Sequence, residues 1–474
     1  MNETQISTDT IAAISTPPGR GGIGIVRLSG PEAASISAQL VRLRQPLEHA
    51  RARLADVLDG TENGAETDNA SGNIARIDEA LVTWFAAPNS YTAEDVVEIA
   101  AHGSPVVLEL LLKRALALGA RLAEPGEFTQ RAFLAGRLDL TQAEAVRDLI
   151  EAQTLTQVRQ AARQMGGALS RRVAPAKHAL VELIALLEAG IDFAEDDVDV
   201  TPQSEIARRI GELTPQLTAL EASFARGRIV HDGLTLAIVG RPNAGKSSLF
   251  NRLLARDRAI VTPLPGTTRD TLEESLALGG IPLRLIDTAG LRPDGADEAE
   301  QHGIARTHEA LADADLILLI HDATLPHSPE EIALTASLAG RPHLIVENKV
   351  DLLSITITGA PRLDSETSDE PPAIHTSALT GEGLDDLRSA ILAQLGAAGS
   401  LAETGLLNNV RQQQSVAAAL TALANAAAAN AASLPHEMIL LDLHTALRAL
   451  DSLTGVTTAD DILARIFSTF CIGK

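Results

Sequence analysis

The sequence predicts a multidomain fold: an α+β N-terminal domain, an all-α helical bundle, and an α/β domain inserted into that bundle. The 474 residues suggest several domains, at about 100–200 residues each. Aromatic residues make up 2% and hydrophobic residues 45% of the chain. The cores therefore consist of Leu, Ile, Val and Ala, which favours helices and parallel sheets. Strand patterns that end in polar motifs fill the middle of the chain, and helical patterns flank them on both sides.

Residues 1–136 form the predicted α+β domain. Its strand patterns fall at 10–14, 24–28, 79–85 and 96–100, and its helical pattern falls at 105–118. The Gly-rich segment 17–22 joins the first two strands. It is either a plain hairpin connection or a place where a ligand or another chain approaches the backbone. The polar stretch 60–73 has almost no large apolar residue and is predicted to be a surface loop.

Helical patterns occupy both flanks of the central part. They fall at 144–163, 180–191, 204–224, 412–432, 435–453 and 458–470. We predict a discontinuous helical domain, 137–228 with 397–474, and an inserted domain at 229–396, because the two ends of an inserted domain lie close together. The acidic run 195–199 fits either a metal site or a solvated linker. Liganding carboxylates are normally spread around a turn, which favours the linker.

The inserted domain begins with a phosphate-binding pattern. The apolar strand pattern 234–239 is followed by Gly240, four further residues, Gly245, Lys246 and Ser247, and then by a helix start. Backbone N–H groups of such a loop surround phosphates, Lys246 reaches the outer phosphates, and the Ser247 hydroxyl ligates magnesium. The predicted nucleotide contacts of this loop are Asn243, Ala244, Gly245, Lys246, Ser247 and Ser248.

Further motifs follow at successive strand–loop junctions. A Thr-containing loop comes first, and Thr268 in it is a predicted magnesium ligand. Asp-Thr-Ala-Gly then follows the strand pattern 283–286, Asn-Lys-x-Asp follows 343–346, and Ser-Ala-Leu follows 373–376. The predicted nucleotide contacts in these motifs are Thr262, Pro263, Leu264, Pro265, Gly266, Thr267, Asp287, Thr288, Ala289, Gly290, Asn348, Lys349, Val350, Asp351, Ser377, Ala378 and Leu379.

The Asn-Lys-x-Asp motif predicts that the nucleotide is GTP. Asp351 can accept hydrogen bonds from the N1–H and the 2-amino group of guanine, and adenine does not offer both in the same pattern. A single short motif is a weak signal, whereas this ordered series is specific. The series resembles that of the Ras-like P-loop GTPases, which have a doubly wound α/β sheet.

One position departs from the Ras pattern. Leu291 stands where Ras-type proteins have a Gln that orients the attacking water. A Leu side chain neither donates nor accepts, so either hydrolysis is slow or another group does this work. The nearby carboxylates are Asp297, Glu298 and Glu300. The amide oxygen of Asn243 can hold a monovalent cation where another class of enzyme places an arginine finger.

Bulk properties bound the compartment and the binding surface. The net charge of −23 argues against a surface that grips nucleic acid everywhere, although it leaves room for a local basic patch. Cys471 is the single cysteine, which excludes a disulfide within the chain and fits a reducing compartment. No apolar run reaches about 18 residues, and no signal-peptide pattern is seen, so a cytoplasmic location without a membrane is predicted.

The chain ends in Phe470-Cys471-Ile472-Gly473-Lys474. Cys471 is fourth from the end, as in a prenylation motif, but that motif prefers two aliphatic residues and a final residue other than Lys. Two interpretations of the thiol remain open: it serves catalysis, or it is a buried small residue. The tail is predicted to be ordered near a site.

Motifs along nearly the whole chain resemble one bacterial family, the tRNA uridine-5-carboxymethylaminomethyl modification GTPases, called MnmE or TrmE. Besides the GTPase motifs and the Cys-Ile-Gly-Lys terminus, the resemblance rests on Thr16-Pro17-Pro18-Gly19-Arg20-Gly21-Gly22, Ser90-Tyr91-Thr92-Ala93-Glu94-Asp95, His102-Gly103, Pro125-Gly126-Glu127-Phe128-Thr129-Gln130-Arg131-Ala132-Phe133, Leu138-Asp139-Leu140-Thr141-Gln142-Ala143-Glu144-Ala145 and Ile191-Asp192-Phe193. Only the polar loops 60–73 and 355–372 fall outside it.

This resemblance implies several site assignments. The N-terminal domain is implied to mediate dimerisation and to bind 5-formyl-tetrahydrofolate or a related formyl-tetrahydrofolate. Its implied folate contacts are Arg27, Glu98, Arg137 and Lys474. Cys471 is implicated in the modification chemistry, and Glu300 aligns with the catalytic carboxylate, with Glu298 as the alternative. The implied potassium-coordinating residues are Asn243, Thr262, Leu264 and Thr267. Arg137 stands where some relatives have Lys.

The resemblance also implies cofactors and partners. GTP, Mg²⁺ and K⁺ are the implied ligands of the nucleotide domain, whose two copies associate across a homodimer when K⁺ is bound. The flavoprotein MnmG (GidA) is the implied partner in a hetero-oligomer. The implied product is an aminomethyl-type modification at C5 of the wobble uridine of certain tRNAs, and the partner is expected to supply much of the grip on tRNA. The alternative function is a regulatory GTPase switch without modification chemistry.

Overall fold

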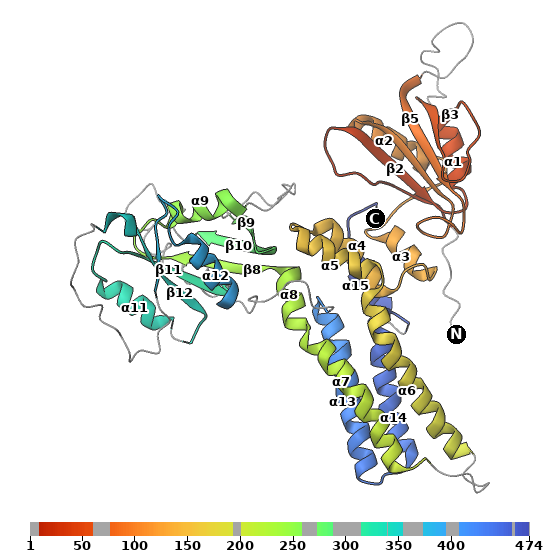
Figure 1. The fold of residues 1–474 in the computed structure, drawn as a ribbon. Helices are drawn as coiled ribbons and strands as arrows, with labels where there is room; N and C mark the ends of the chain where they lie inside the picture. The colour runs from red at the N-terminus through yellow and green to blue at the C-terminus, as the bar shows by residue number, and fades with distance from the viewer. Residues whose placement is uncertain are drawn as a thin grey trace. The chain divides into compact units, whose positions relative to one another are not determined.

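The computed structural model describes residues 9–59, 76–192, 201–257, 273–287, 314–338, 340–353, 373–394, 407–456 and 460–473 (Figure 1). The chain forms two compact units. The first contains residues 1–147, 165–172 and 447–474, and the second contains 148–164 and 173–446. The polar loops and the acidic run 195–199 lie outside the described residues. None of the described helices is long and apolar enough to cross a membrane.

The first unit is built on a mixed sheet of seven described strands in the order β3-β4-β5-β6-β2-β1-β7. Their bounds are β1 Ile11–Ile14, β2 Gly21–Ser29, β3 Val41–Leu43, β4 Ala52–Leu58, β5 Arg76–Phe85, β6 Val96–Gly103 and β7 Arg121–Leu122. The first two strands pair antiparallel with Ile11 opposite Ser29, so the Gly-rich segment after β1 is part of a hairpin connection. Every strand that the sequence predicted in this region is confirmed.

Two helices cover one face of this sheet: α1, Ala33–Leu40, and α2, Pro105–Ala117. Alternate residues of the strands point into this core, such as Val26 and Leu28 of β2 and Val97 and Ile99 of β6. The intervening residues Arg27 and Glu98 therefore face the other side, where the strand register places them directly opposite each other. A short helix, α3 Glu127–Leu134, follows β7.

Helices occupy both flanks of the nucleotide domain in the sequence. Their bounds are α4 Leu140–Glu151, α5 Leu155–Met165, α6 Ala168–Asp192, α7 Gln203–Ala222, α8 Phe224–Asp232, α13 Val410–Ala431, α14 His436–Thr454 and α15 Asp460–Phe467. In Figure 1, α6, α7, α13 and α14 run alongside one another. His444 of α14 contacts Glu188 of α6 at 3.1 Å. Helices from before and after the nucleotide domain are thus in contact with each other.

The single helix predicted at 144–163 is wrong, because the chain breaks between α4 and α5. Thr154 starts a new helix: its hydroxyl accepts from the N–H of Gln157 at 3.2 Å, and the Gln157 side chain accepts from the Thr154 N–H at 3.1 Å. This reciprocal capping box satisfies N–H groups that lack partners at a helix start. The apolar period continues across the break, which is why the pattern alone suggested one helix.

The nucleotide domain has a doubly wound sheet in the order β13-β12-β11-β8-β10-β9. The strands are β8 Leu234–Val239, β9 Glu273–Leu278, β10 Ile281–Asp287, β11 Leu316–Asp322, β12 His343–Asn348 and β13 Ile374–Thr376, and only the β9–β10 pair is antiparallel. Leu236 and Ile238 of β8 point towards α9 (Lys246–Asp257) and α12 (Leu384–Gln394). Ala237 and Val239 point towards α11 (Pro329–Ser337). Burial on both faces explains why these strands are continuously apolar.

Candidate functional site

The phosphate loop lies at the switch point of the nucleotide sheet. The chain leaves β8 to form β9 and β10 on one side and then returns to place β11 on the other side of β8. Neighbouring parallel strands whose connections run in opposite directions leave a crevice at their carboxyl ends, where ligands of such folds bind. The loop between β8 and α9 opens at this point, which confirms the predicted strand–loop–helix context.

Two glycines of the loop are required by close packing. Gly240 has φ 149°, and a Cβ there would lie 2.2 Å from the carbonyl oxygen of Ile320. Gly245 has φ 91°, and a Cβ there would lie 2.2 Å from Nδ2 of Asn348. An L side chain at either position meets both backbone strain and a clash. The phosphate loop is therefore pressed against the ends of β11 and β12.

Lys246 is buried at the start of α9 and points back into the loop. Its Nζ donates to the carbonyl oxygens of Gly240 at 2.7 Å and Arg241 at 2.8 Å. These two hydrogen bonds hold the amine on the inner side of the loop. Ser247 and Ser248 are exposed in the first turn of α9, where backbone N–H groups and the positive end of the helix dipole favour an anion.

The guanine-selecting motif is tied directly to the phosphate loop. Asn348, buried at the end of β12, donates from Nδ2 to the carbonyl oxygen of Ala244 at 3.0 Å. Its Oδ1 accepts from the N–H of Ala378 at 3.0 Å. One side chain therefore holds together three motifs that the sequence placed in the site: the phosphate loop, Asn-Lys-x-Asp and Ser-Ala-Leu.

The rest of the base motif surrounds this bridge. Lys349 adopts the left-handed φ of 68°, and Asp351 is exposed in the short helix η2, Val350–Leu352. Ser377 is buried, and its Oγ accepts from the N–H of Thr380 at 3.0 Å. Leu379 is 77% exposed, which leaves its backbone as the part that can serve the site.

Asp322 is a member of this site that the sequence analysis missed. Its carboxylate accepts from Nζ of Lys349 at 2.6 Å and from the hydroxyl of Thr324 at 2.6 Å. Burial raises the pKa of this carboxyl, but the hydrogen bonds from Lys349 and Thr324 outweigh burial, and the net pKa is lowered. The signal was available, because Asp322 ends an apolar strand next to the strand that ends in Asn348.

Several predicted residues lie outside the described part of the chain. They are Thr262, Pro263, Leu264, Pro265, Gly266, Thr267, Thr268, Thr288, Ala289, Gly290, Leu291, Asp297, Glu298 and Glu300. Strand β10 ends at Asp287, whose backbone pairs with Ile238 beside the phosphate loop. Asn243 is exposed within that loop and has a φ of 64°.

A second set of predicted residues meets in the first unit. Arg27 donates from Nε to Oε1 of Glu98 at 2.9 Å and from Nη1 to the carbonyl oxygen of Gly473 at 3.3 Å. The hydroxyl of Ser15 donates to the same carbonyl at 3.1 Å. The C-terminal tail is therefore docked on the sheet face opposite α1 and α2, and Lys474 follows directly but is not described.

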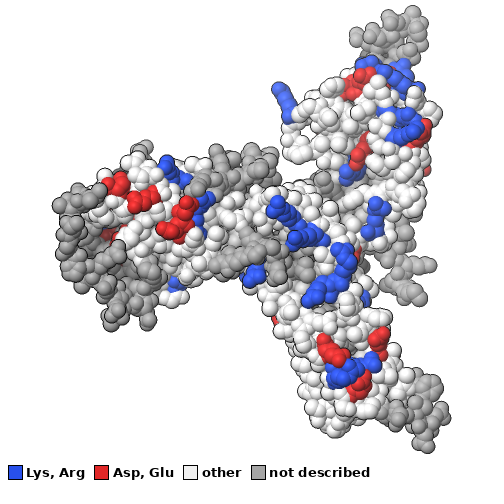
Figure 2. Space-filling view, viewed as in Figure 1, with Lys and Arg blue, Asp and Glu red and all other residues white. Residues whose placement is uncertain are grey.

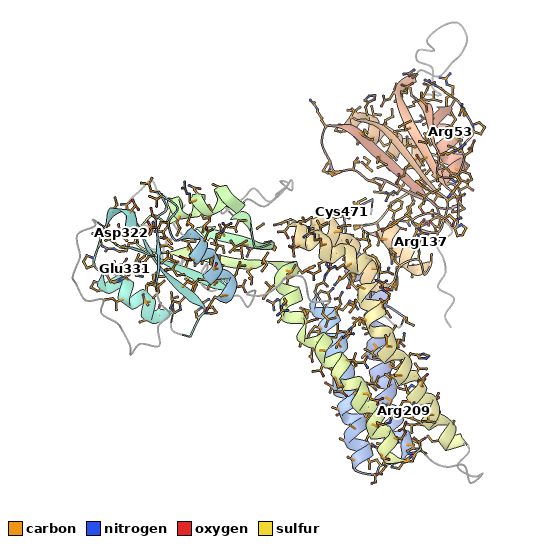
Figure 3. All side chains as sticks on the ribbon, viewed as in Figure 1. Arg53, Arg137, Arg209, Asp322, Glu331 and Cys471 are labelled. Atoms are coloured by element: carbon orange, nitrogen blue, oxygen red, sulfur yellow. The ribbon has the colours of Figure 1, made fainter. Side chains whose placement is uncertain are left out.

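The tail is fixed at further points. Pro125 forms a bridge with Ile472, and the N–H of Gly126 donates to the carbonyl oxygen of Cys471 at 3.4 Å. Cys471 is exposed, so the interpretation as a buried small residue is wrong. Arg137, labelled in Figure 3, is also exposed. Among the described residues, the hydrogen bonds of Arg27 are with Glu98 and Gly473 and not with Arg137.

Aromatic rings surround the Arg27 guanidinium. Its carbon lies 5.6 Å from the ring centroid of Phe128 and 6.0 Å from that of Tyr91. Burial raises the pKa of the Tyr91 phenol, whose oxygen is 2.9 Å from the Thr129 hydroxyl. The Arg27 cation therefore lies beside two aromatic rings and the docked chain end.

A cavity of about 280 Å³ lies in the second unit, away from both sets of residues. It is lined mainly by polar side chains from the α4–α5 turn, the end of α8, and Asn408. His231 in its wall lies 3.0 Å from Oδ1 of Asp148 and 2.6 Å from Oδ1 of Asp232. Burial lowers the pKa of His231, but these two carboxylates outweigh burial and raise the pKa to about 10. Sequence analysis missed this cluster, because its members carry no local motif.

Comparisons with known proteins cover the whole chain. The family model described as "MnmE helical domain" matches residues 140–471, and that described as "GTP-binding protein TrmE N-terminus" matches residues 10–137. A "tRNA modification GTPase MnmE" of Koribacter versatilis is 53% identical over 98% of this chain and 99% of its own length. One from Nitrosomonas europaea is 43% identical over 99% of this chain and 100% of its own length.

Two solved structures also match part of the chain. The G domain of the T. maritima FeoB iron transporter is 29% identical, covers 34% of this chain and 98% of its own, and has a TM-score of 0.26. Aquifex aeolicus Era bound to GDP.AlF4- is 25% identical, covers 40% of this chain and 66% of its own, and has a TM-score of 0.28.

Proposed function

The chain belongs to the MnmE (TrmE) family of tRNA modification GTPases, and on that premise we propose that it uses GTP hydrolysis to drive modification at C5 of the wobble uridine of certain tRNAs. The observation that carries the nucleotide part is the Asn348 bridge, which joins the guanine motif to the phosphate loop. In this arrangement the base and the phosphates of one GTP are held by groups whose relative positions are already set.

The described residues fit a magnesium-bound GTP. The glycine loop leaves no room for side chains, Lys246 is aimed into it, and the hydroxyl of Ser247 is exposed at the start of α9. Lys246 would neutralise the outer phosphates, and Ser247 would hold Mg²⁺ with Thr268. Bound Mg²⁺ neutralises charge that develops on the phosphate oxygens. Asp351 would accept from the guanine edge, and the N–H groups of Ser377–Leu379 would face the base.

We further propose that K⁺ takes the place of an arginine finger. Asn243 is exposed in the phosphate loop, so its amide oxygen is available to a cation on the open side of the loop. The remaining proposed ligands, Thr262, Leu264 and Thr267, lie outside the described residues, as does the proposed catalytic carboxylate Glu300. K⁺ would favour association of two nucleotide domains in a homodimer, which supplies a closed environment for hydrolysis.

The docked tail supports a one-carbon function in the first unit. Arg27 and Glu98 form a pair that a folate head group can engage, and the chain end reaches this pair through Gly473. We propose that 5-formyl-tetrahydrofolate or a related formyl-tetrahydrofolate binds here with Arg137 and Lys474. The exposed thiol of Cys471, two residues from the docked carbonyl, is then placed to take part in the modification.

The tRNA is proposed to be held mainly by a flavoprotein partner, MnmG (GidA). The net charge of −23 limits what this chain alone contributes to phosphate binding. On the face in Figure 2, however, Lys and Arg side chains gather where α5 lies, while acidic and basic side chains mix elsewhere. Helix α5 carries exposed Arg159 and Arg163 and no acidic residue. This helix is the proposed local contact with RNA, in a cytoplasmic complex.

We also propose the domain limits 1–136, 137–228 with 397–474, and 229–396. The alternative function is a regulatory switch that binds an effector and performs no modification. The docking of the C-terminal tail against Arg27 favours the first function, because a pure switch has no need for an exposed thiol beside a chain end that is docked on an arginine. Changing Cys471 to Ser distinguishes the two: modified uridine is lost under the first function and unchanged under the second.

The experiment that tests the proposed mechanism is GTP hydrolysis by the full chain in potassium and in sodium, with Glu300→Ala alongside. We expect much faster hydrolysis in potassium, and we expect Glu300→Ala to lose activity in both salts while still binding GTP. Equal rates in the two salts would contradict the cation role of Asn243. If Glu300→Ala retains full activity, the catalytic carboxylate is another residue. Glu298→Ala, measured in parallel, tests the alternative carboxylate.

A further inference from the structure

A cluster of two histidines and a glutamate lies beside the guanine-binding end of the nucleotide sheet. His321 is the penultimate residue of β11, His327 is in the loop that follows, and Glu331 is in the first turn of α11. Their nearest ligand atoms all lie within 4.8 Å of one another. None of the three takes part in the nucleotide site described above, although His321 directly precedes Asp322. We propose that they form a site for one Zn²⁺-class divalent transition-metal ion.

The distances between the ligand atoms suit such an ion. Nδ1 of His321 lies 2.9 Å from Nδ1 of His327 and 3.4 Å from Oε1 of Glu331. In a tetrahedral zinc site with bonds of roughly 2.0–2.2 Å, neighbouring ligand atoms lie about 3.3–3.6 Å apart. An opening of a few tenths of an ångström between the two rings therefore admits the metal. Two His and one Glu leave a fourth position for water.

The two rings are arranged for shared coordination. Their centroids are 4.4 Å apart and their planes are nearly perpendicular, at 76°, so the two Nδ1 atoms meet without stacking. Without a metal, a proton on one Nδ1 must lie between two nitrogens that otherwise present lone pairs to each other. A metal ion takes the position of that proton, and binding releases it. Burial and the neighbouring His327 lower the pKa of His321, which favours the neutral imidazole that ligates metals.

The groups behind the ligands hold them in place. The other oxygen of Glu331, Oε2, accepts from the N–H of Ser328 at 2.8 Å, and the Ser328 hydroxyl accepts from the N–H of Glu331 at 3.2 Å. This capping box fixes the carboxylate with Oε1 turned towards His321, as a supporting hydrogen bond does for ligands in known metal sites. Glu331 and His321 are buried, whereas His327 is exposed and provides the entry path.

One neighbouring cation opposes the metal. Arg241 belongs to the phosphate loop, and its Nη1 lies 3.8 Å from Oε2 of Glu331. At that distance, and with Arg241 42% exposed, the pair is weak, and the Arg can turn to solvent when a metal neutralises Glu331. Figure 3 labels Glu331 and Asp322 in the nucleotide domain. A bound metal would pin the start of α11 to the end of β11, next to the Asp322–Lys349 pair.

The test uses the untagged full chain with Cys471→Ser, so that neither a tag nor the thiol competes for metal. GDP and excess Mg²⁺ occupy the nucleotide site. Co²⁺ is titrated and followed by its visible ligand-field absorption, and Zn²⁺ is then added as competitor. We expect one equivalent of Co²⁺ with the strong absorption of a four- or five-coordinate site, and complete displacement by Zn²⁺.

Variants assign the ligands. His327→Ala changes an exposed residue, and Glu331→Gln retains an acceptor for the capping box while it removes the carboxylate. Each is expected to weaken Co²⁺ binding at least roughly tenfold. His375→Ala is the matched control, since His375 forms a 3.0 Å pair with Glu347 in the same sheet but has no third ligand among the described residues. It is expected to bind like the parent. Absence of a stoichiometric site in the parent, or parent-like binding by either His327→Ala or Glu331→Gln, would overturn the proposal.

Discussion

The nucleotide site and the tail site of this chain are assembled in opposite ways. Around the nucleotide, each parallel strand delivers one short motif at its carboxyl end, and neighbouring strands bring the motifs together. At the tail site, Arg27 meets Gly473 from a position 446 residues away, and Ser15 meets the same carbonyl from 458 residues away. The first site depends on local strand–loop geometry, whereas the second depends on the whole first unit being folded around the chain end.

This difference predicts different sensitivities. A substitution in the phosphate loop is expected to impair GTP hydrolysis without affecting the docked tail, because the loop is stabilised by the neighbouring strands. A substitution at Arg27 is expected to weaken the docking of the chain end without affecting GTP hydrolysis, because Arg27 makes its contacts in the first unit and not with the nucleotide sheet. Lys246→Ala and Arg27→Gln are each expected to impair one of the two sites and to leave the other unchanged.

The largest effect is expected from Lys246→Ala. The amine is buried in the loop and is proposed to neutralise charge on the outer phosphates, so its loss should slow GTP hydrolysis by about 10²–10³-fold. Single-turnover hydrolysis measures this, with folate binding as the readout for the tail site. Lys113→Ala is the control, because Lys113 is an exposed helix residue that pairs with the exposed Glu109. Loss of folate binding in Lys246→Ala would show that the two sites are not independent.

An intermediate effect is expected from Arg27→Gln. The change removes the cation that pairs with Glu98 and one of the two donors to the Gly473 carbonyl. Binding of 5-formyl-tetrahydrofolate should weaken by roughly tenfold, while GTP hydrolysis stays at the parent rate. Calorimetric titration provides the affinity. Arg44→Gln, which breaks ion pairs with Asp56 and Glu79 in the same unit, should bind folate normally. Equal affinities for Arg27→Gln and Arg44→Gln would remove Arg27 from the proposed folate site.

A smaller effect, on stability rather than chemistry, is expected from His231→Gln. The folded-state pKa of about 10 exceeds the ordinary value of 6.5, so the ion pairs with Asp148 and Asp232 stabilise the fold fully below pH 6.5. That contribution is lost as the pH rises from 6.5 towards 10. At pH 6 the variant should be destabilised by about 2 kcal/mol, a value discounted for partial exposure and for the remaining Asn408 donor to Asp148.

Denaturant unfolding of parent and variant across this pH range measures the effect, and the difference should shrink towards pH 10. His375→Gln, whose partner pair is mostly exposed, should change stability by less than about 0.5 kcal/mol at any pH. A stability difference between parent and His231→Gln that grows with pH would contradict a stabilising role of the protonated imidazole.

The nucleotide site could be predicted from the sequence because each of its motifs lies at the end of one strand. The strand ends before Gly240, Asn348 and Ser377 were recognisable because each apolar run stops at a polar motif, and the structure brings these motifs together through Asn348. The same reasoning overlooked Asp322 only because no motif was attached to it. In α1, the buried positions are Ala33, Ile36, Ser37 and Leu40. Because Ala33 and Ser37 are small, the apolar pattern is too weak to reveal the helix.

Contacts of long sequence separation could not be predicted in this way. No local feature of Arg27 indicates that its second acceptor is the carbonyl of Gly473, and only the family resemblance placed Arg27 in one site with Lys474, the residue that follows Gly473. The break at Thr154 was missed for a different reason: a Thr-x-x-Gln capping box was present but hidden within a continuous apolar period. The cluster of His231 with Asp148 depends on packing between helix ends, which periodicity does not report.

The central claim is that the Asn348-centred site selects guanine through Asp351, and one substitution tests it directly. Asp351→Asn replaces a carboxylate acceptor by an amide that can donate to the 2-carbonyl of xanthine. Hydrolysis of GTP and of xanthosine triphosphate is measured for the parent and for this variant under the same conditions. The parent should prefer GTP, and the variant should prefer xanthosine triphosphate. An unchanged preference for GTP in the variant would contradict the account.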